Sequence, residues 1–371
     1  MKNVLFIHSS SELYGSDRSL LNIVKNIDKT NFKVFVVLPC LGPLVDEIKK
    51  IQGVQLDIFE VAVLRRKNLS VKGAISYLKE FNSSMRYLNT YIEKHEIEIV
   101  DTNTAAVFSG AIAAKRCKKK SVWHIREIIK SNLENKVISF MMQHYSDLVI
   151  ANSKSTGEAL KILQDKVRVV YNAVEEISNN SLISHQQLTV GMAGRINRWK
   201  GQKLFVDMAE VVHRKYPDVL FKIAGEAYMG EEYLKSDLQD YISSKGLQET
   251  VLLLGQVNNM SSFYCGLDIF VLPSIQPEPF GLVIIEAMEF GIPVVATNHG
   301  GPVEIISEGF DGYLVSHEDC AEMAERVMNL IKNAELRRQM GNEGMKKKRE
   351  QFSVLAMVKG VEAVFEESLS H

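Results

Sequence analysis

Two glutamates eight positions apart, Glu278 and Glu286, enclose a Phe-Gly-Leu triplet in the most chemically suggestive segment of the chain. This segment predicts a loop carrying Glu278 that leads into a helix near Gly281, with Glu286 further along that helix. The first N–H groups of a helix have no intrahelical partner and attract anions, while carboxylates accept hydrogen bonds from hydroxyls. The segment therefore indicates a ligand with both hydroxyls and phosphates. Glu286 has an alternative interpretation as a helix residue paired with a neighbouring cation.

Two cations, Arg195 and Lys200, lie in a Gly-Arg-Ile-Asn-Arg-Trp-Lys-Gly segment between a predicted strand and a predicted helix. Arginine offers a planar fork for phosphate oxygens, and lysine acts as a mobile point charge. Together they would neutralise a diphosphate. The alternative interpretation is a pair of exposed loop cations.

A third candidate segment follows the first predicted strand. Gly15 permits the close approach of a ligand, and Ser16 or Asp17 would cap a helix whose N–H groups attract phosphate. The loop has neither a G-x-G-x-x-G nor a Walker sequence, so the dinucleotide-cofactor and ATPase motifs are absent from it. A glycine turn of this kind is more often structural. The same holds for His124 at the end of another predicted strand, unless it faces a ligand cleft.

The elements that must position these residues alternate between short apolar runs and longer helical patterns, which is typical of parallel sheets wrapped by helices. In the first half we predict strands over residues 4–8, 33–38, 98–101, 121–124, 147–151 and 167–171, and helices over 17–27, 74–94, 105–115 and 154–163. In the second half we predict strands over 188–193, 219–224, 251–254, 269–272, 293–296 and 312–315, and helices over 202–214, 231–244, 281–290, 320–332 and 334–350.

This alternation predicts an α/β protein of two Rossmann-like, doubly wound domains that face each other across a cleft. The first domain spans 1–172, a linker rich in Ser, Asn and Glu spans 173–187, and the second domain spans 188–352. Residues 353–371 are predicted to form a helix that returns to the first domain. In such sheets ligands bind at the carboxyl ends of the strands, and a cleft between domains is the default site.

The net charge of −1 conceals two halves of opposite sign. Residues 1–180 hold 26 basic against 19 acidic side chains, a net charge of +7, and the remainder carries −8. The basic half includes Arg65, Arg66, Lys67 and the run 115–120, which nucleic acid, anionic lipid or a phosphate-bearing ligand could use. The alternative is a solvated face.

No apolar run approaches the roughly 18–20 residues that span a bilayer, and the apolar stretch at the N-terminus is too short for a signal peptide, so a cytoplasmic protein is expected.

Together these segments resemble the retaining glycosyltransferases of family 4, the glycosyl transferases group 1, whose two-domain fold is named GT-B. The resemblance covers essentially the whole chain and is strongest over residues 15–20, 191–201 and 273–304, where a Gly-Gly-Pro-Val-Glu turn follows the acid pair. It implies hexosyl transfer from a UDP- or GDP-linked sugar to a saccharide or lipid-linked saccharide, with retention of anomeric configuration and without a metal or other cofactor. It also implies surface polysaccharide or glycolipid biosynthesis as the setting.

The resemblance implies roles for individual residues. Arg195 and Lys200 would bind the donor diphosphate, Glu278 would contact the transferred sugar, and His124 would lie near that sugar and contribute to catalysis. Further donor-binding residues would contact phosphate, ribose or nucleobase: Gly15, Ser16, Gly225, Glu226, Val257, Phe280, Gly281, Leu282, Val283 and Glu286. Asp17 and Arg18 would lie on the acceptor side of the site.

Two departures bear on these roles. Many relatives have two glycines and a glutamate in the first loop, whereas this chain reads Tyr-Gly-Ser-Asp-Arg, which leaves Asp17 between acceptor contact and capping. The sequence has no Asp-x-Asp motif. That agrees with a metal-independent enzyme in which cations and helix dipoles stabilise the leaving group.

Two other functions agree with parts of the sequence. A nucleotide-sugar epimerase of the same fold would use its donor without a saccharide acceptor, so incubation with donor alone separates it from a transferase. A nucleotide- or polyanion-binding module would use the basic half, but the chain lacks a basic strand interleaved with aromatic residues, and no nucleic-acid partner is expected.

A lipid-linked acceptor would bring the basic half to anionic headgroups at the inner membrane face, which predicts peripheral membrane binding.

Overall fold

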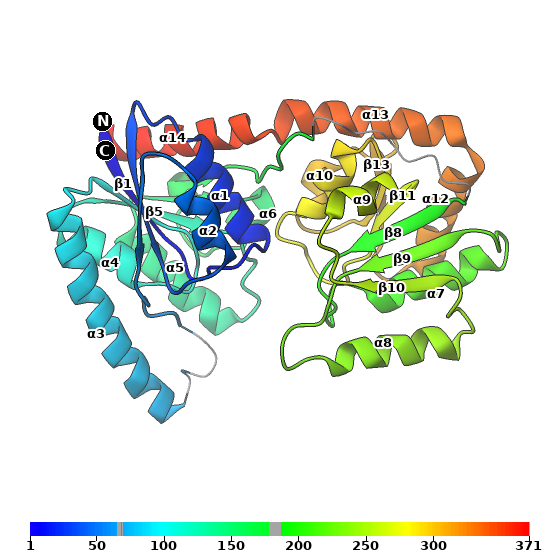
Figure 1. Cartoon of the computed structure of the whole chain (residues 1–371), viewed down its shortest axis with the longest axis horizontal. Coiled ribbons are helices and arrows are strands. Elements are labelled where there is room, and N and C mark those ends of the chain that lie inside the picture. The colour runs from blue at the N-terminus through cyan, green and yellow to red at the C-terminus, as the bar shows by residue number, and fades with distance from the viewer. Residues whose placement is uncertain (65–67, 69, 178–186, 371) are drawn as a thin grey trace. The chain divides into compact units, whose positions relative to one another are not determined.

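The protein is described by a computed structural model that covers residues 1–64, 68, 70–177 and 187–370. The basic residues 65–67 and most of the predicted linker, residues 178–186, lie outside this description. The chain divides into two compact units (Figure 1). Unit 1 comprises Met1–Ala173 together with Val354–His371, and unit 2 comprises Val174–Ser353.

Unit 1 contains a parallel sheet of seven strands in the order β3-β2-β1-β4-β5-β6-β7. Its strands are β1 (Lys2–Ile7), β2 (Phe32–Leu38), β3 (Val54–Ile58), β4 (Ile99–Thr102), β5 (Lys120–Ile125), β6 (Leu148–Ala151) and β7 (Val167–Val169). The strand order reverses between β1 and β4, where Phe6 pairs with Asp101. A ligand of a doubly wound sheet binds beside such a switch point, at the carboxyl ends of the strands.

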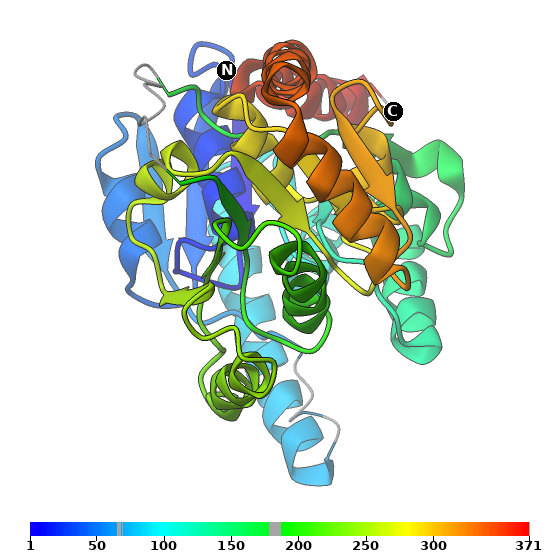
Figure 2. The same cartoon turned by 90° about the vertical axis from the view of Figure 1, so that its right-hand side faces the viewer.

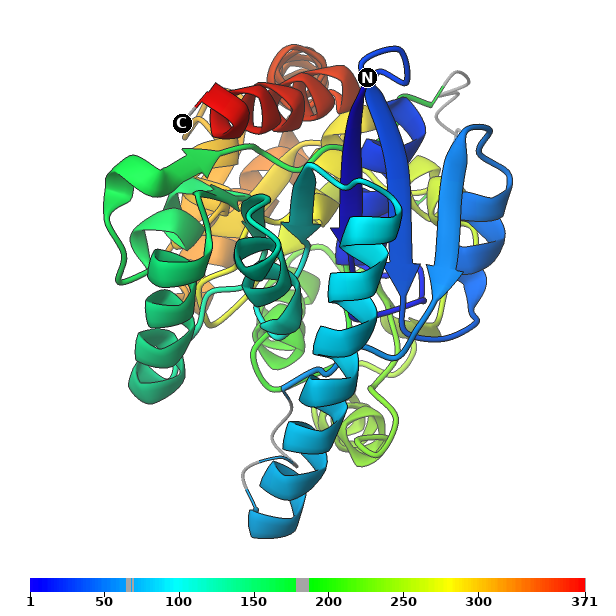
Figure 3. The same cartoon turned by 90° about the vertical axis from the view of Figure 1, so that its left-hand side faces the viewer.

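Helices cover both faces of this sheet (Figure 3). The helices are α1 (Gly15–Asn26), α2 (Pro43–Lys49), α3 (Val71–Lys94), α4 (Ser109–Arg116), α5 (Asn132–Tyr145), α6 (Lys154–Glu158), the 3₁₀ turn η2 (Gln164–Lys166) and α14 (Val354–Ser370). One core packs α1, α2 and α14 against the sheet, and the cores on the opposite face involve α3, α4 and α5. The alternating side chains of one strand divide between the two faces, which is why Phe6 belongs to the first core and Leu5 to the second.

Helix α14 completes the core of unit 1 although it follows the whole of unit 2 in the sequence. Its buried residues Val358, Val361 and Phe365 recur at helical spacing and form one apolar stripe. The Phe365 ring centroid lies 5.9 Å from that of Phe6 and 6.0 Å from that of Phe32. The first strand and the last helix therefore share one core.

Unit 2 contains a parallel sheet of six strands in the order β10-β9-β8-β11-β12-β13 (Figure 2). The strands are β8 (Thr189–Ala193), β9 (Leu220–Ala224), β10 (Val251–Gly255), β11 (Ile269–Leu272), β12 (Val294–Thr297) and β13 (Gly312–Val315). The helices are α7 (Gln202–His213), α8 (Tyr233–Ser244), α9 (Met260–Cys265), α10 (Leu282–Glu289), α11 (Pro302–Ile305), α12 (Cys320–Lys332) and α13 (Ala334–Gln351). Helices α7, α8 and α12 share one core with the sheet. The strand order reverses between β8 and β11.

The predicted α/β class with two parallel sheets is confirmed. Elements that the sequence did not predict are β3, α2, α5, α9 and the 3₁₀ turn η2. The edge strand β3 places Gln55 and Asp57 among its apolar residues, so its pattern is weak. The helix predicted over 154–163 ends at Glu158, and the helix predicted from residue 105 begins at Ser109. Within the described ranges, no helix has the length and apolar character that crossing a bilayer requires.

Candidate functional site

The centre of the candidate site in unit 2 is an ion pair between Lys200 and Glu278. The Lys200 Nζ lies 2.7 Å from Glu278 Oε2, and the two side chains are 15% and 10% exposed. Ser274 Oγ donates a second hydrogen bond to the same carboxylate oxygen, at 3.1 Å. The two charges are far apart in the sequence, but β8 and β11, whose following loops carry them, are neighbours in the sheet. The predicted diphosphate cation and the predicted sugar-binding carboxylate are therefore in contact.

The loop from β8 to α7 has a fixed backbone that presents Lys200. The side chain of Asn197 accepts hydrogen bonds from the N–H groups of Trp199 and Lys200, at 3.0 and 2.8 Å. Gly201 begins α7 with a φ of +77°, and a Cβ at this position would stand 1.8 Å from the carbonyl oxygen of Pro273. A side chain cannot fit there, so the glycine permits the close approach of the two loops.

Arg195 follows the end of β8 and is exposed. Its guanidinium lies over the ring of Tyr228, 5.0 Å from the centroid, a cation–π arrangement that orients the planar group. Its carbonyl oxygen accepts a hydrogen bond from Gln202 Nε2 at 2.9 Å. Arg195 and Lys200 thus stand in one loop at the carboxyl edge of the sheet, as the sequence predicts.

Helix α10 begins beside this ion pair. Gly281 is its N-cap, in the left-handed conformation, and Leu282 and Val283 form its first turn. The Phe280 side chain is 2% exposed and packs 5.8 Å from the Phe352 ring, so it anchors the loop in the core. The N–H groups at this helix start point toward the same edge of the sheet as the cations, which makes the region attractive to anions.

The Gly-Gly-Pro turn after β12 supports the Glu278 backbone. Gly301 N–H donates to the carbonyl oxygen of Glu278 at 2.7 Å. Gly300 has a φ of +71°, and a Cβ there would lie 2.3 Å from that oxygen. Nearby, His299 Nε2 lies 2.7 Å from the carbonyl oxygen of Ser274, and burial lowers the pKa of His299. The sequence did not identify His299 as a site residue, because only its glycine-rich context distinguishes it.

Glu286 is oriented by a tyrosine that sequence reasoning missed. The hydroxyl of Tyr264, on α9, donates to Glu286 Oε2 at 2.7 Å. Tyr264 is 1% exposed and its ring packs 5.5 Å from the ring of Phe290. Because the tyrosine is rigidly packed, it fixes the Glu286 carboxylate in one position. Nothing in the sequence pattern connects the two residues.

The predicted nucleobase residues stand at the ends of neighbouring strands. Gly225 follows β9, and its N–H donates to the carbonyl oxygen of Gly255 at 2.8 Å. Glu226 is paired with Lys235, with 2.6 Å between Oε1 and Nζ. Val257 follows β10 and is half-buried. Every predicted residue of unit 2 except Glu286 therefore lies in a loop or helix start that follows a strand's carboxyl end.

In unit 1, Gly15 and Ser16 form the first residues of α1. Asp17 is fully buried; it accepts a hydrogen bond from the Tyr14 N–H at 2.9 Å and lies 2.6 Å from His8 Nε2. Through these two contacts the Asp17 carboxylate stabilises the loop that follows β1. Arg18 is exposed, and its Nε donates to the carbonyl oxygen of Leu13.

His124 belongs to a buried polar cluster at the carboxyl edge of the unit 1 sheet. It is 1% exposed, and its Nδ1 lies 3.8 Å from Asp101 Oδ2. Among the described residues neither side chain has a hydrogen-bond partner. Burial and the nearby Arg126 hold the pKa of His124 well below its usual value. Burial raises the pKa of Asp101 to about 7, against the opposing charge of Arg126.

Replacing Asp101 with asparagine should change how stability depends on pH. A raised carboxyl pKa means that the folded chain keeps a proton which the unfolded chain releases above about pH 4, so the group lowers stability as pH rises from about 4 to about 7. The free energy of unfolding of Asp101→Asn, measured relative to that of the wild type, should therefore increase by about 3 kcal/mol as the pH rises from 5 to 8. His124 has the opposite slope in both proteins and cancels in the comparison. Urea unfolding at several pH values measures this; parallel pH profiles would rule it out.

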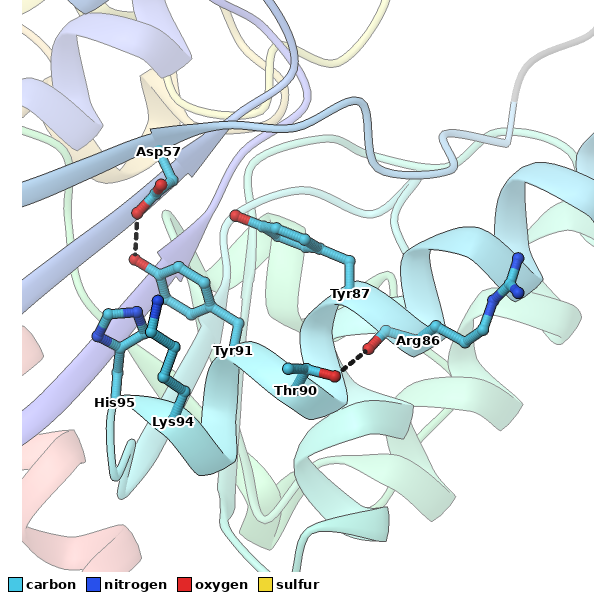
Figure 4. Close-up of a pocket in the computed structure, with 7 residues that line it drawn as sticks. All are labelled: Asp57, Arg86, Tyr87, Thr90, Tyr91, Lys94 and His95. Carbon is cyan, nitrogen blue, oxygen red and sulfur yellow. Dashed lines mark hydrogen bonds between the residues drawn. The ribbon is translucent and has the colours of Figure 1, made fainter.

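A separate hollow of about 430 Å³ lies between β3 and α3 (Figure 4). Tyr91 donates a hydrogen bond to Asp57 Oδ2 at 2.7 Å, and burial raises the pKa of Tyr87 to about 12. Tyr87 is stacked on Phe59 with 3.8 Å between centroids. None of the predicted site residues lines this hollow, so it is distinct from the candidate site.

The whole chain is similar in fold to solved glycosyltransferases. A crystal structure of Anabaena Alr3699/HepE in complex with UDP and glucose matches with a TM-score of 0.82 at 21% identity, over 99% of this chain and 100% of that chain. A glycosyltransferase from Rickettsia africae matches with a TM-score of 0.82 at 19% identity, over 99% of this chain and 98% of that chain. The protein therefore has the GT-B glycosyltransferase fold, which confirms the predicted fold class.

Two family models divide the chain between them. Glycosyltransferase Family 4 matches residues 14–176, and Glycosyl transferases group 1 matches residues 173–347. An uncharacterized glycosyltransferase of Methanocaldococcus jannaschii is 27% identical over 310 residues, which are 79% of this chain and 84% of that protein. The chain belongs to the family 4 glycosyltransferases, as its motifs predict.

Proposed function

We propose that this glycosyltransferase moves a sugar from a nucleoside diphosphate sugar to an acceptor hydroxyl, with retention of anomeric configuration and without a metal ion. The observation that carries the proposal is the contact between Lys200 and Glu278 beside the start of α10. Here a cation for phosphate, a carboxylate for sugar hydroxyls and helix N–H groups occur together. Arg195 adds a second cation in the same loop.

In the proposed reaction the bond between the anomeric carbon and the β-phosphate oxygen breaks. The acceptor oxygen bonds to the anomeric carbon from the same face, and its proton passes to the departing phosphate oxygen. Arg195, Lys200 and the first N–H groups of α10 stabilise the negative charge that develops on the diphosphate. Glu278 positions the sugar, and Glu286, held by Tyr264, binds the ribose hydroxyls.

The names of relatives support a class of acceptor. LpsB of Rhizobium meliloti, a lipopolysaccharide core biosynthesis mannosyltransferase, is 29% identical over 179 residues, 48% of this chain and 51% of that protein. CapM of Staphylococcus aureus, a capsular polysaccharide biosynthesis glycosyltransferase, is 26% identical over 237 residues, 64% of this chain and 60% of that protein. We therefore propose a saccharide or lipid-linked saccharide acceptor, in surface polysaccharide or glycolipid biosynthesis, at the cytoplasmic face of the membrane.

A donor screen tests this proposal. Purified protein with a chelator is heated with UDP-, GDP- and other nucleotide sugars, and one class should raise the unfolding temperature because binding stabilises the folded state. HepE was solved with UDP-glucose, so UDP-sugars are the first to try. The selected donor is then incubated with saccharide acceptors, and NMR of the product should show the donor's anomeric configuration. An inverted product would exclude retention, and isomerisation of donor alone would identify an epimerase.

A further inference from the structure

The edge strand β3 directs a carboxylate toward helix α3, in the hollow between them. Asp57 pairs with Val37 in the sheet, and Val37 is buried in the core beneath α3. Paired residues of neighbouring strands point to the same face, so Asp57 occupies a position where an apolar side chain would extend that core. Inward-pointing charges protect edge strands from pairing with other chains. Such protection accounts for the carboxylate, but it does not account for the side chains opposite it.

Three ring side chains of α3 line the hollow opposite this carboxylate (Figure 4). Tyr87, Tyr91 and His95 recur every four residues, which aligns them on one stripe of the helix. The Tyr91 ring centroid lies 5.6 Å from that of Tyr87 and 4.3 Å from that of His95. Phe59 stacks on Tyr87, and Phe35 packs 5.2 Å from His95. The rings are thus fixed in advance, which lowers the entropic cost of packing a ligand on them.

Two exposed cations, Arg86 and Lys94, stand beside the ring stripe and also line the hollow. Within the ranges that the structure describes, neither side chain has a hydrogen bond or an ion pair. Eight residues separate the two along α3, which is about 12 Å. Thr90 lies between them, and its hydroxyl donates to the carbonyl oxygen of Arg86 at 3.0 Å. The lining therefore combines rings, two separated cations and the Asp57 carboxylate, whose Oδ2 accepts the Tyr91 hydroxyl at 2.7 Å.

The chemistry of this lining fits an anionic oligosaccharide. The C–H faces of a sugar ring are apolar and pack on aromatic rings, while sugar hydroxyls can donate to Asp57 and accept from Arg86 and Lys94. A diphosphate concentrates its charge at one point, whereas these cations are about two helical turns apart. A saccharide chain with spaced acidic groups matches that separation. An acidic peptide also has spaced charges, but it offers few hydroxyl donors to the Asp57 carboxylate.

We propose that the hollow between β3 and α3 is a second saccharide site, which binds an anionic oligosaccharide. The inference goes beyond the proposed sugar transfer and does not rest on it, because every residue that carries it lines the hollow or packs behind its rings. The ligand would lie along α3, with its rings over Tyr87 and His95 and its acidic groups at Arg86 and Lys94.

Calorimetric titration of the full chain tests the site. The probe is a hyaluronan tetrasaccharide, in which glucuronates alternate with neutral sugars, and chitotetraose is the uncharged oligosaccharide of equal length. The wild type should bind hyaluronan more tightly than chitotetraose. Arg86→Gln with Lys94→Gln should weaken hyaluronan binding at least about tenfold, the effect of losing one hydrogen bond to a charged group, and should leave chitotetraose binding unchanged. Tyr87→Leu should weaken both about fivefold, because the aromatic surface is lost, whereas Tyr87→Phe should keep it.

Matched variants locate the effect. Tyr145→Leu removes another half-buried tyrosine of unit 1 that lies beside a lysine, and Arg116→Gln with Lys118→Gln removes two other exposed cations. Both should bind hyaluronan as the wild type does, and so should Lys200→Ala, which alters the candidate site. The proposal is overturned if the wild type does not bind hyaluronan, if folded Tyr87→Leu binds it normally, if any of these three matched variants loses it, or if hexaglutamate binds more tightly than hyaluronan.

Sugar transfer to a short soluble acceptor separates this proposal from the proposed function. Tyr87→Leu and the Arg86/Lys94 double variant should retain wild-type transfer, because none of the candidate site residues lines the hollow. Normal transfer by a wild type that binds no hyaluronan would reject the second site alone. Hyaluronan binding through Tyr87 by a protein that uses no nucleotide sugar would reject the proposed function and leave the second site supported.

Discussion

Replacing Lys200 or Arg195 with alanine is expected to reduce sugar transfer about 10²–10³-fold for each change, the typical effect of removing one preorganised charge-stabilising group. Both side chains stand in the loop after β8, where they would meet the diphosphate as its charge develops. Lys200 also neutralises Glu278 at 2.7 Å, so Lys200→Ala leaves a largely buried carboxylate without its counter-charge. Steady-state transfer assays measure the loss, and circular dichroism confirms that the variants are folded.

Arg198→Ala is the matched control for this prediction. Arg198 lies between the two cations in the same loop, is exposed, and hydrogen-bonds the Tyr233 hydroxyl at 3.3 Å. Its removal should change transfer by less than a factor of about three, because an exposed pair of this kind contributes little. Arg195→Lys keeps the charge but not the planar fork of the guanidinium. Its rate of sugar transfer should lie between that of the wild type and that of Arg195→Ala. Near-normal transfer by both alanine variants would disprove the diphosphate assignment.

Lys348→Met is expected to destabilise the protein by about 3–5 kcal/mol, because it removes the counter-charge of a buried carboxylate. Lys348 of α13 is 0% exposed, and its Nζ lies 2.5 Å from Oε2 of Glu289 at the end of α10. The other oxygen of Glu289 accepts the N–H of Ile177 at 3.0 Å. This pair therefore ties α13, α10 and the chain entering unit 2 to one another. Urea or thermal unfolding measures the loss.

A second substitution distinguishes charge from packing. Adding Glu289→Gln to Lys348→Met removes the stranded charge but keeps an acceptor for the Ile177 N–H, so the double variant should recover much of the lost stability. Arg338→Met provides the control on the same helix. It breaks a pair with Glu335 whose side chains are 72% and 69% exposed, and it should cost less than about 1 kcal/mol. Equal losses from Lys348→Met and Arg338→Met would contradict the prediction.

The buried strands were predictable because each is a short, continuous apolar run. The strand predicted over 269–272 has the bounds of β11, and that over 312–315 has those of β13. The failures have a physical cause. Helix α5 has apolar residues on both sides, because Met142 is buried in the core while Leu133 and Phe140 are exposed. Its apolar residues therefore do not form the single stripe that predicts a surface helix. The edge strand β3 is covered less than the central strands and tolerates polar residues.

The site was predictable in residue type but not in contacts. The spacing of Glu278 and Glu286 and the Gly-Arg…Lys-Gly loop identified the segments that meet at one edge of the unit 2 sheet. The contact of Lys200 with Glu278 depends on β8 and β11 being neighbours, which no local pattern specifies. Tyr264 and Asp101 were missed for the same reason, since each acts on a predicted residue from another element. Asp17 carries a buried hydrogen-bond network with His8 that its sequence context does not reveal.

The place of α14 has a consequence for the order of folding during synthesis. Phe6 and Phe32 emerge early from the ribosome, yet their core lacks Phe365 until residues 354–365 have been made. By then all of Val174–Ser353 has been translated, so unit 2 can fold as a complete body while unit 1 is still missing a helix. Domains generally fold as units as they emerge. Unit 2, the later unit in the sequence, is therefore the first that can finish, and the core that β1, β2 and α14 share stays incomplete until residues 354–365 have been made.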